Sequence, residues 1–490
     1  MRKITANLQV EKGRLNRYFS NCIGAGRAGE VMRYSTMKQL EKIQRECPFK
    51  YIRFHGLFHE EMNIVNRDEN GNLIFCFQYI DLLFDSLLDC GIRPVVELGL
   101  MPQIMAEEER YVFWWKMNIS SPKKIDEWYA LIEALVKHVT ERYGEEEIKK
   151  WYFEVWNEPN HSSFFSKSTE IEEYFKLYDS AARAVKKINA EYRVGGPATA
   201  GMAWITDFIR HCRDNKVPLD FISSHSYGVK GDFDADGKAI LKLCPVDSLA
   251  DCVRFFGDIC KKEGLPLLIT EWSSSYSSRD PIHDTYFNAP YILNTVKRCD
   301  GYADMLSYWT YTDIFEESSP PCKPFHGGFG LINVQSIPKP SFYAYTFLNR
   351  LGNTEFECND EKAYFCASDE EIQLLFWNIV QPTQNVDNRT YFLQPLPSKS
   401  IEDVEIEISG LESNRKYMIC VETIGYRSGD VYNVYIDGGF TDLTTREETN
   451  KLIELSKPKK VFYEYVSDAQ GVLKFYLPQT ENQVDFVTIS

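Results

Sequence analysis

The stretch WYFEVWNEPN (Trp151–Asn160) changes character within a few residues, and this change indicates both a fold and a site. Its first half is aromatic and β-branched, as in a buried strand, and Pro159 has no backbone N–H with which to continue a sheet. The strand therefore ends where the carboxylate of Glu158 begins. A glutamate at a strand end, rather than on a solvated helix face, is either a structural ion-pair partner or a catalytic group.

Similar short apolar runs alternate with helical patterns through the first two thirds of the chain. We predict strands at residues 18–24, 51–56, 94–99, 151–156, 192–196, 221–227, 266–270 and 305–311. One intervening helix stops at Gly91, and Ser121-Pro122 opens another that runs to Gly144. Because right-handed strand–helix crossovers repeated about eight times close into a barrel, the pattern predicts an α/β fold, a (β/α)₈ TIM barrel, over residues 14–345.

The spacing of apolar residues along the sequence changes after a helical pattern that ends at Gly352. Alternating segments separated by polar turns follow, and they are typical of strands. These segments are residues 363–368, 372–380, 403–411, 416–424, 459–466 and 473–477. They predict a C-terminal β-sandwich, an accessory domain over residues 346–490. The N-terminal residues 1–13 also have the pattern of a strand and could join that sandwich.

Composition excludes several classes of function. The chain has 490 residues, 44% of them hydrophobic and 26% charged, which is typical of a globular protein with more than one domain. Its formal net charge of −16 repels phosphate backbones and anionic lipid heads, and no long apolar run is present. We therefore predict neither a nucleic acid nor a membrane as a partner.

The 13 cysteines are odd in number and contain no Cys-x-x-Cys pair. This usage favours neither a disulfide framework nor a zinc site, and it fits reduced thiols in a cytoplasm. The N-terminal residues are basic but lack a following apolar segment. We expect a cytoplasmic protein, or a secreted or periplasmic one whose signal peptide has been removed.

A second strand-end carboxylate occurs in LLITEWSSS, where Glu271 directly follows the seventh predicted strand. In a TIM barrel the C-terminal ends of all strands meet at one mouth, so Glu158 and Glu271 can face each other across a substrate. Glycoside hydrolysis needs such a pair: one acid protonates the leaving oxygen, and one carboxylate attacks or stabilises the anomeric carbon.

Six strand-end motifs in order resemble glycoside hydrolase family 39, whose best-known members are β-xylosidases. The motifs are RFHG, ELGLMP, WNEPN, HSYG, ITEW and YWTYTDIFEE. The resemblance covers residues of roughly 15–345, and a sandwich after the barrel also fits the family. It implies a retaining exo-β-glycosidase, first of all a β-D-xylosidase that releases xylose from the non-reducing end of xylo-oligosaccharides. It implies no cofactor and no metal, a small carbohydrate as substrate, and an oligomeric state that stays open, homo-oligomers included.

Matched to the family, Glu158 is the general acid/base and Glu271 is the nucleophile. The chemistry of the residues agrees, because two nearby carboxylates repel and one of them keeps its proton. Arg53 and the Tyr227 hydroxyl would favour the ionised form of Glu271, which assigns the proton to Glu158.

The predicted substrate-binding residues follow the same strand ends. They are Asn157, His55, His225, Tyr227, Trp309, Glu316, Arg53 and Phe113. Asn157 is expected to donate to the sugar 2-hydroxyl, and the two histidines to bind ring hydroxyls. Trp309 would offer an aromatic face, Glu316 an acceptor for remote hydroxyls, and Phe113 with Trp114 a wall at the entrance. The alternatives are structural: satisfied histidines, a core tryptophan, and Arg53 as a counter-charge.

Two rival functions stay open. An α-L-iduronidase-like enzyme, or another retaining glycosidase, would use the same carboxylates. A uronic acid calls for cationic recognition, however, and Tyr227 stands where such enzymes have a lysine, so a neutral sugar is favoured. A carbohydrate-binding protein without catalysis is the other rival, and the intact pair Glu158 and Glu271 counts against it.

Overall fold

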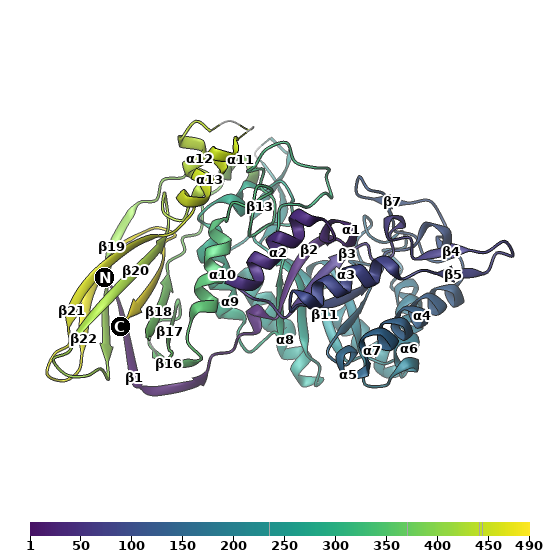
Figure 1. Cartoon of the computed structure of the whole chain (residues 1–490), viewed down its shortest axis with the longest axis horizontal. Helices are drawn as coiled ribbons and strands as arrows, with labels where there is room; N and C mark the ends of the chain where they lie inside the picture. Colours follow the sequence, from purple (N-terminus) through teal and green to yellow (C-terminus); the bar gives the residue numbers. More distant parts are fainter. Residues whose placement is uncertain (235, 370, 441, 443) are drawn as a thin grey trace.

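A closed barrel of eight parallel strands forms the larger part of the molecule (Figure 1). The computed structural model describes residues 1–234, 236–369, 371–440, 442 and 444–490. In chain order the barrel strands are β2 (Cys22–Arg27), β3 (Tyr51–His55), β6 (Arg93–Leu98), β9 (Tyr152–Val155), β10 (Arg193–Thr199), β11 (Phe221–Tyr227), β14 (Leu267–Ser273) and β15 (Met305–Tyr308). This architecture confirms the predicted TIM barrel.

Helices cover the outside of the barrel. The longer ones are α2 (Tyr34–Glu46), α3 (Gln78–Asp89), α4 (Ile125–Tyr143), α6 (Ile171–Ile188), α7 (Ile205–Asp214), α8 (Ser248–Lys262), α9 (Asn288–Cys299) and α10 (Pro340–Arg350). Most of them bury one apolar face against the strands, whereas α9 is buried on nearly all sides. In α6, for example, Tyr174, Leu177, Tyr178 and Ala181 are buried at helical spacing, while the opposite face carries charges.

Short elements decorate the loops of the barrel. Short helices are η1 (Tyr18–Ser20), α1 (Ala28–Val31), η2 (Glu60–Met62), η3 (Gln103–Met105), α5 (Glu145–Ile148), η4 (Ala200–Met202) and η5 (Pro281–Asp284). Antiparallel hairpins pair β4 (Val65–Arg67) with β5 (Leu73–Phe75), β7 (Tyr111–Val112) with β8 (Met117–Asn118), and β12 (Val229–Phe233) with β13 (Ala239–Leu243). The last hairpin continues directly from β11 and becomes important at the site.

Several predicted boundaries are wrong: the fifth barrel strand runs on to Thr199, the eighth ends at Tyr308, and two further boundaries differ for local reasons. Tyr18 begins a short 3-10 helix instead of a strand, because Asn21 donates to the carbonyl of Tyr18 in a turn, and β2 starts only at Cys22. Helix α4 begins at Ile125 rather than at Ser121-Pro122. The carbonyl of Ser121 accepts from the N–H of Glu107, which holds the predicted helix start in extended form.

The other body is a nine-stranded sheet with the order β21-β20-β23-β18-β17-β16-β1-β19-β22. Its strands are β1 (Arg2–Arg14), β16 (Thr354–Cys358), β17 (Ala363–Ala367), β18 (Ile372–Trp377), β19 (Ser400–Ser409), β20 (Lys416–Ile424), β21 (Lys459–Val466), β22 (Leu473–Thr480) and β23 (Val484–Ile489). The outer strands β21 and β22 contact each other, so the sheet folds over a second core that includes Phe365, Ile406 and Phe475. It is therefore sandwich-like but continuous.

The N-terminal strand β1 lies inside this sheet, antiparallel to β16 and parallel to β19. Three helices lie in the connections of the sheet: α11 (Asn388–Phe392), α12 (Val431–Asp437) and α13 (Arg446–Leu455). Figure 1 shows α11 near β13, on the side of the sheet that faces the barrel. Both chain termini lie in the sheet, away from the barrel.

The 13 cysteines are free thiols, and most are at least half-buried. No helix in the described parts of the chain is long and apolar enough to cross a membrane.

Candidate active site

A cavity of about 520 Å³ lies at the C-terminal ends of the barrel strands. This is the end at which TIM barrels carry their active sites. Residues that line it come from separate strand ends: His55 from β3, Asn157 and Glu158 from the turn after β9, Tyr227 from β11, Glu271 from β14 and Trp309 from the turn after β15. Residues far apart in the sequence thus meet in one pocket.

A strained turn brings Glu158 into the cavity. Strand β9 ends at Val155, and the backbone then adopts left-handed conformations at Trp156 (φ 72°) and Glu158 (φ 43°). Such angles are uncommon for residues with a side chain, and they are enriched at functional sites. The N–H of Glu158 donates to the carbonyl of Ala198 at 2.8 Å, which fixes the turn to the next strand.

Glu271 lies within β14 instead of directly after it. The predicted strand end at Thr270 is wrong, because β14 keeps pairing with β11 as far as Ser273 opposite Tyr227. Arg53 Nη1 donates to Glu271 Oε1 at 2.6 Å, and the Tyr227 hydroxyl donates to Oε2 at 2.6 Å. Both carboxylate oxygens are therefore held by hydrogen bonds, which orient Glu271 in the cavity.

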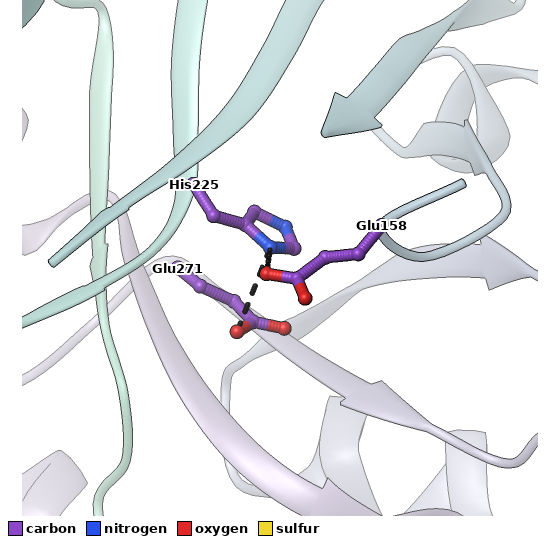
Figure 2. A group of neighbouring side chains, drawn as sticks. All are labelled: Glu158, His225 and Glu271. Atoms are coloured by element: carbon purple, nitrogen blue, oxygen red, sulfur yellow. Dashed lines mark hydrogen bonds and ion pairs between the residues drawn. The ribbon is translucent and has the colours of Figure 1, made fainter. Parts of the chain in front are cut away.

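The two candidate catalytic carboxylates are close neighbours. Figure 2 shows His225 beside both of them. One carboxylate oxygen of Glu158, one of Glu271 and a ring nitrogen of His225 all lie within 4.8 Å of one another. His225 Nδ1 is 2.9 Å from Glu158 Oε1 and 3.6 Å from Glu271 Oε2. Retaining glycosidases hold their carboxyl groups about 5 to 5.5 Å apart, whereas inverting ones need about 6.5 Å or more to seat a water. The arrangement fits direct attack by a carboxylate.

Burial determines the protonation of Glu158 and His225. Burial raises the pKa of Glu158, and the positive charges of His161, His55 and Arg53 only partly oppose it. Burial also lowers the pKa of His225 to about 4, so its imidazole is neutral near pH 7. Glu158 is therefore the group suited to hold a proton for the leaving oxygen.

Glu158, His225 and Glu271 also supply three donor atoms that could hold a divalent cation. A cation there would occupy the place of the Glu158 proton and neutralise Glu271. Acid and nucleophile roles for these residues therefore require the cation to be absent.

Arg53 lies beneath the cavity and does not line it. It is fully buried, and its guanidinium donates to Glu154 at 2.5 Å and to Asn157 Oδ1 at 2.9 Å, besides Glu271. It also forms an ion pair with Glu97 at 2.9 Å. Such a shared cation orients Glu271 and Asn157 instead of contacting a sugar.

His55 is held in the same buried network. Its Nδ1 lies 2.7 Å from Glu97 Oε2. Burial alone would lower the pKa of His55, but Glu97 outweighs it and raises the pKa to about 9. The cationic ring therefore presents Nε2 toward Glu271, 3.6 Å away.

Asn157 and Trp309 both line the cavity. Because Asn157 Oδ1 accepts from Arg53, its amide NH₂ group is left to donate to a substrate hydroxyl. The Trp309 ring lies 5.0 Å from the His55 ring and packs with Phe315 and Phe329. It lines the cavity although only 2% of its surface is exposed.

Four predicted residues lie outside the cavity lining, namely Arg53, His225, Glu316 and Phe113. Glu316 is bound by ion pairs to Arg27 and Arg33. Its neighbour Glu317 lines the cavity instead, and burial raises the pKa of Glu317 to about 8. Phe113 stacks behind His55, with ring centroids 6.2 Å apart.

Other lining residues carried no signal that sequence reasoning used. Among them are Glu317, His161, Phe164, Tyr276 and Phe329. Glu317 could have been found as the alternative within its Glu-Glu pair, but the rest lie in loops with no motif. Glu154, the buried partner of Arg53, was also missed, because it looked like an interior strand residue.

A TIM barrel with neighbouring carboxylates on its fourth and seventh strands is the architecture of a glycoside hydrolase. The sequence matches the glycosyl hydrolases family 39 over residues 2–470, and the chain belongs to this family. A beta-xylosidase of Caldicellulosiruptor saccharolyticus is 38% identical over 463 residues, 94% of this chain and 92% of that protein. A beta-xylosidase of Geobacillus stearothermophilus is 40% identical over 370 residues, 73% of each chain.

The structure agrees with the sequence comparison. The solved monomeric beta-xylosidase of Caulobacter crescentus CB15 superimposes with a TM-score of 0.94 at 37% identity, covering 100% of this chain and 99% of that one. Human alpha-L-iduronidase is more distant, with 26% identity over 196 residues, 37% of this chain. The family resemblance predicted from the strand-end motifs is confirmed.

The raised pKa of Glu158 predicts the alkaline side of the pH profile. A general acid works only while protonated, so kcat/KM should fall as pH rises through the pKa of Glu158. Glu158→Gln should remove this fall for aryl glycosides with good leaving groups, which need no acid. Glu317→Gln is the matched control and should keep the fall. If instead the fall persists in Glu158→Gln and disappears in Glu317→Gln, Glu317 is the group that titrates.

Proposed function

We propose that this family 39 glycoside hydrolase is an exo-acting β-D-xylosidase. It would release xylose from the non-reducing end of xylo-oligosaccharides with retention of configuration. The observation that carries the mechanism is the approach of Glu158 and Glu271 to within 4.8 Å in a buried pocket. The names of the relatives, which are beta-xylosidases at 38 to 40% identity, support the sugar.

In the first step Glu271 attacks the anomeric carbon while Glu158 gives its proton to the glycosidic oxygen. The bond between that carbon and oxygen breaks, the leaving sugar departs as an alcohol, and an α-linked ester forms on Glu271. Arg53 and Tyr227 hold the two carboxylate oxygens of Glu271 in place beforehand. Neutral His225 stays hydrogen-bonded to Glu158 and keeps its carboxyl group in place.

In the second step Glu158 acts as a base. Esterification removes the charge of Glu271, so Glu158 no longer has an anionic neighbour and ionises more readily. It takes a proton from water, the oxygen of that water attacks the anomeric carbon, and the ester bond breaks. Two inversions give β-xylose and restore both carboxyl groups.

The loops around one end of the pocket support exo action. Arg27 at the end of β2 is paired with Glu316 from the loop after β15. The N–H of Trp114, after β6, donates to the carbonyl of Glu317 in the same loop at 3.3 Å. These links join three loops on the side where Glu317 and Trp309 line the cavity. A polymer could not thread past that side, so a chain end has to enter.

The charges of the pocket support a neutral sugar. Among the described residues that line it, none is a lysine or an arginine. The N–H groups of Arg53 are engaged by carboxylates and by Asn157. On entering the pocket, the carboxylate of a uronic acid would therefore lose its hydration shell without gaining a strong cationic partner. This favours xylosides over iduronides.

Aryl glycosides that share one leaving group test the proposed sugar. We expect kcat/KM to be highest for the β-D-xyloside, and about 10- to 100-fold lower for the β-D-glucoside, whose hydroxymethyl group must fit a closed pocket end. A preference for the α-L-iduronide, or for internal cleavage of xylan over xylobiose, would refute the proposal. Binding of xylobiose without any turnover would instead identify a carbohydrate-binding protein.

A further inference from the structure

The connection between β18 and β19 leaves the nine-stranded sheet and lies on the barrel (Figure 1). Its helix α11 contacts both the barrel hairpin strand β13 and the 3-10 helix η5. Both of these belong to loops at the active-site end of the barrel. We call residues 381–389 of this connection the arm.

The arm first binds the edge of β13 and the residues after it. Side-chain oxygens of Asp387, Gln384 and Gln381 accept from the backbone N–H groups of Leu241, Leu243 and Val246, at 2.8, 3.0 and 2.8 Å. These three acceptors take the place of a neighbouring strand.

The hairpin that the arm holds is tied to the catalytic strands. The N–H of Cys244 donates to Gly228 at 2.8 Å, and the N–H of Gly228 donates to Ser273 of β14 at 3.0 Å. Residue Val229 at the base of the hairpin lines the cavity, next to Tyr227. The arm therefore supports the hairpin of β12 and β13, which forms the part of the cavity lining that follows β11.

The arm also binds the loop after β14. Asn388 Nδ2 donates to Asp280 Oδ2 at 2.7 Å, and both side chains are fully buried. Arg389 Nη2 donates to Ser277 Oγ at 2.8 Å. A buried carboxylate is costly without such partners, so these bonds fix the path of residues 277–280.

Tyr276 stands immediately before this fixed segment. It lines the cavity, and 50% of its surface is exposed, whereas Trp309 and Phe329 at the closed end expose 2% and 1%. Its ring meets that of Tyr227 edge-on, with centroids 6.3 Å apart. Because the sugar at the chain end fills the closed side, the leaving sugar must extend toward the open side and Tyr276.

We propose that the arm of the second domain is a positioning element for the leaving-group side of the active site. Through Asn388 and Arg389 it holds Tyr276 as the wall against which the leaving sugar packs. The inference rests on the proposed function, since it assumes a xylosyl group at the closed end. Tyr276 can contact the leaving sugar only until the glycosidic bond is broken. Loss of this contact should therefore slow the first step for substrates whose leaving group is a sugar, and it should leave hydrolysis of the ester on Glu271 unchanged.

The test compares two substrates that form the same intermediate. Xylobiose has a sugar as leaving group, whereas β-xylosyl fluoride has a single atom that cannot reach Tyr276. We expect Arg389→Ala and Asn388→Leu to lower kcat/KM for xylobiose about 10-fold and to leave that for the fluoride within about twofold. Arg389 is exposed, so its variant keeps the test valid if Asn388→Leu does not fold.

Two controls separate positioning from general damage. In the described part of the chain, Asn378 hydrogen-bonds to residues of the second domain, among them Gln479 and Asn482, so Asn378→Leu should leave both substrates unaffected. In the Tyr276→Ala background, Arg389→Ala should have no further effect on xylobiose.

Equal losses on both substrates, additive losses with Tyr276→Ala, or no loss at all would overturn the role of the arm. Turnover of the fluoride by the unmodified enzyme tests the proposed sugar separately. The two proposals can therefore fail independently.

Discussion

Glu271→Gly should lose on the order of 10⁵-fold or more in kcat for every xyloside, because no other group can form the bond to the anomeric carbon. Glu271 is held for this attack by Arg53 and Tyr227, each at 2.6 Å. Neither partner is itself a nucleophile under these conditions, so neither can replace it. The loss should be the same for good and poor leaving groups.

Azide should restore activity to Glu271→Gly and should reveal which face is attacked. It would enter the space of the missing carboxylate, attack a β-aryl xyloside once and give the α-xylosyl azide. Glu97→Gly is the matched control, since Glu97 is a buried carboxylate of the same network that binds His55 and Arg53. Azide should not rescue it. A β-xylosyl azide from Glu271→Gly would mean that the two glutamates have exchanged roles.

Glu158→Ala should have an effect that depends on the leaving group. For xylobiose, whose leaving alcohol needs a proton, we expect a loss of about 10³-fold in kcat/KM. For an aryl xyloside with an acidic phenol the first step should remain fast, and the ester on Glu271 should accumulate because no base activates water. Burst kinetics with the two substrates measure this difference.

Azide and a neighbouring carboxylate supply the controls for Glu158→Ala. Azide attacking the accumulated ester should give the β-xylosyl azide, opposite to the product of Glu271→Gly. Glu317→Ala removes another carboxylate that lines the cavity, and its loss should not depend on the leaving group. A loss in Glu158→Ala that is equal for both substrates would contradict its role as the acid.

The barrel could be predicted because each strand is a short apolar run with a clear break. The breaks themselves were less certain where the chain makes a local turn. Tyr18 has the character of a strand residue, yet it starts a 3-10 helix because its carbonyl bonds to Asn21. Strands β16 and β23 were missed, although TEFEC and VDFVTI have the alternation that is typical of a half-buried strand.

His225, predicted to bind ring hydroxyls, lies within β11 against Glu158 and outside the cavity lining. The place of Glu158 at the cavity could be predicted, because it follows a strand. The choice between Glu316 and Glu317 could not, because neighbouring side chains in an extended loop point in different directions. Only the ion pairs of Glu316 with Arg27 and Arg33 show that it faces away from the cavity. The place of Tyr276 in the cavity could not be predicted for a different reason. The loop that carries it is bound by residues more than a hundred positions later, as in the hydrogen bond from Arg389 to the neighbouring Ser277.

The most direct test of the mechanism is to trap the covalent intermediate. A 2-deoxy-2-fluoro-β-xyloside with a good leaving group should inactivate the enzyme, because fluorine slows both steps and the good leaving group keeps only the first one fast. Mass spectrometry of the digested protein should then find one fluoroxylosyl group, on the peptide that contains Glu271 and on that side chain. A label on Glu158, or no label together with α-xylose as the first product of the unmodified enzyme, would contradict the account.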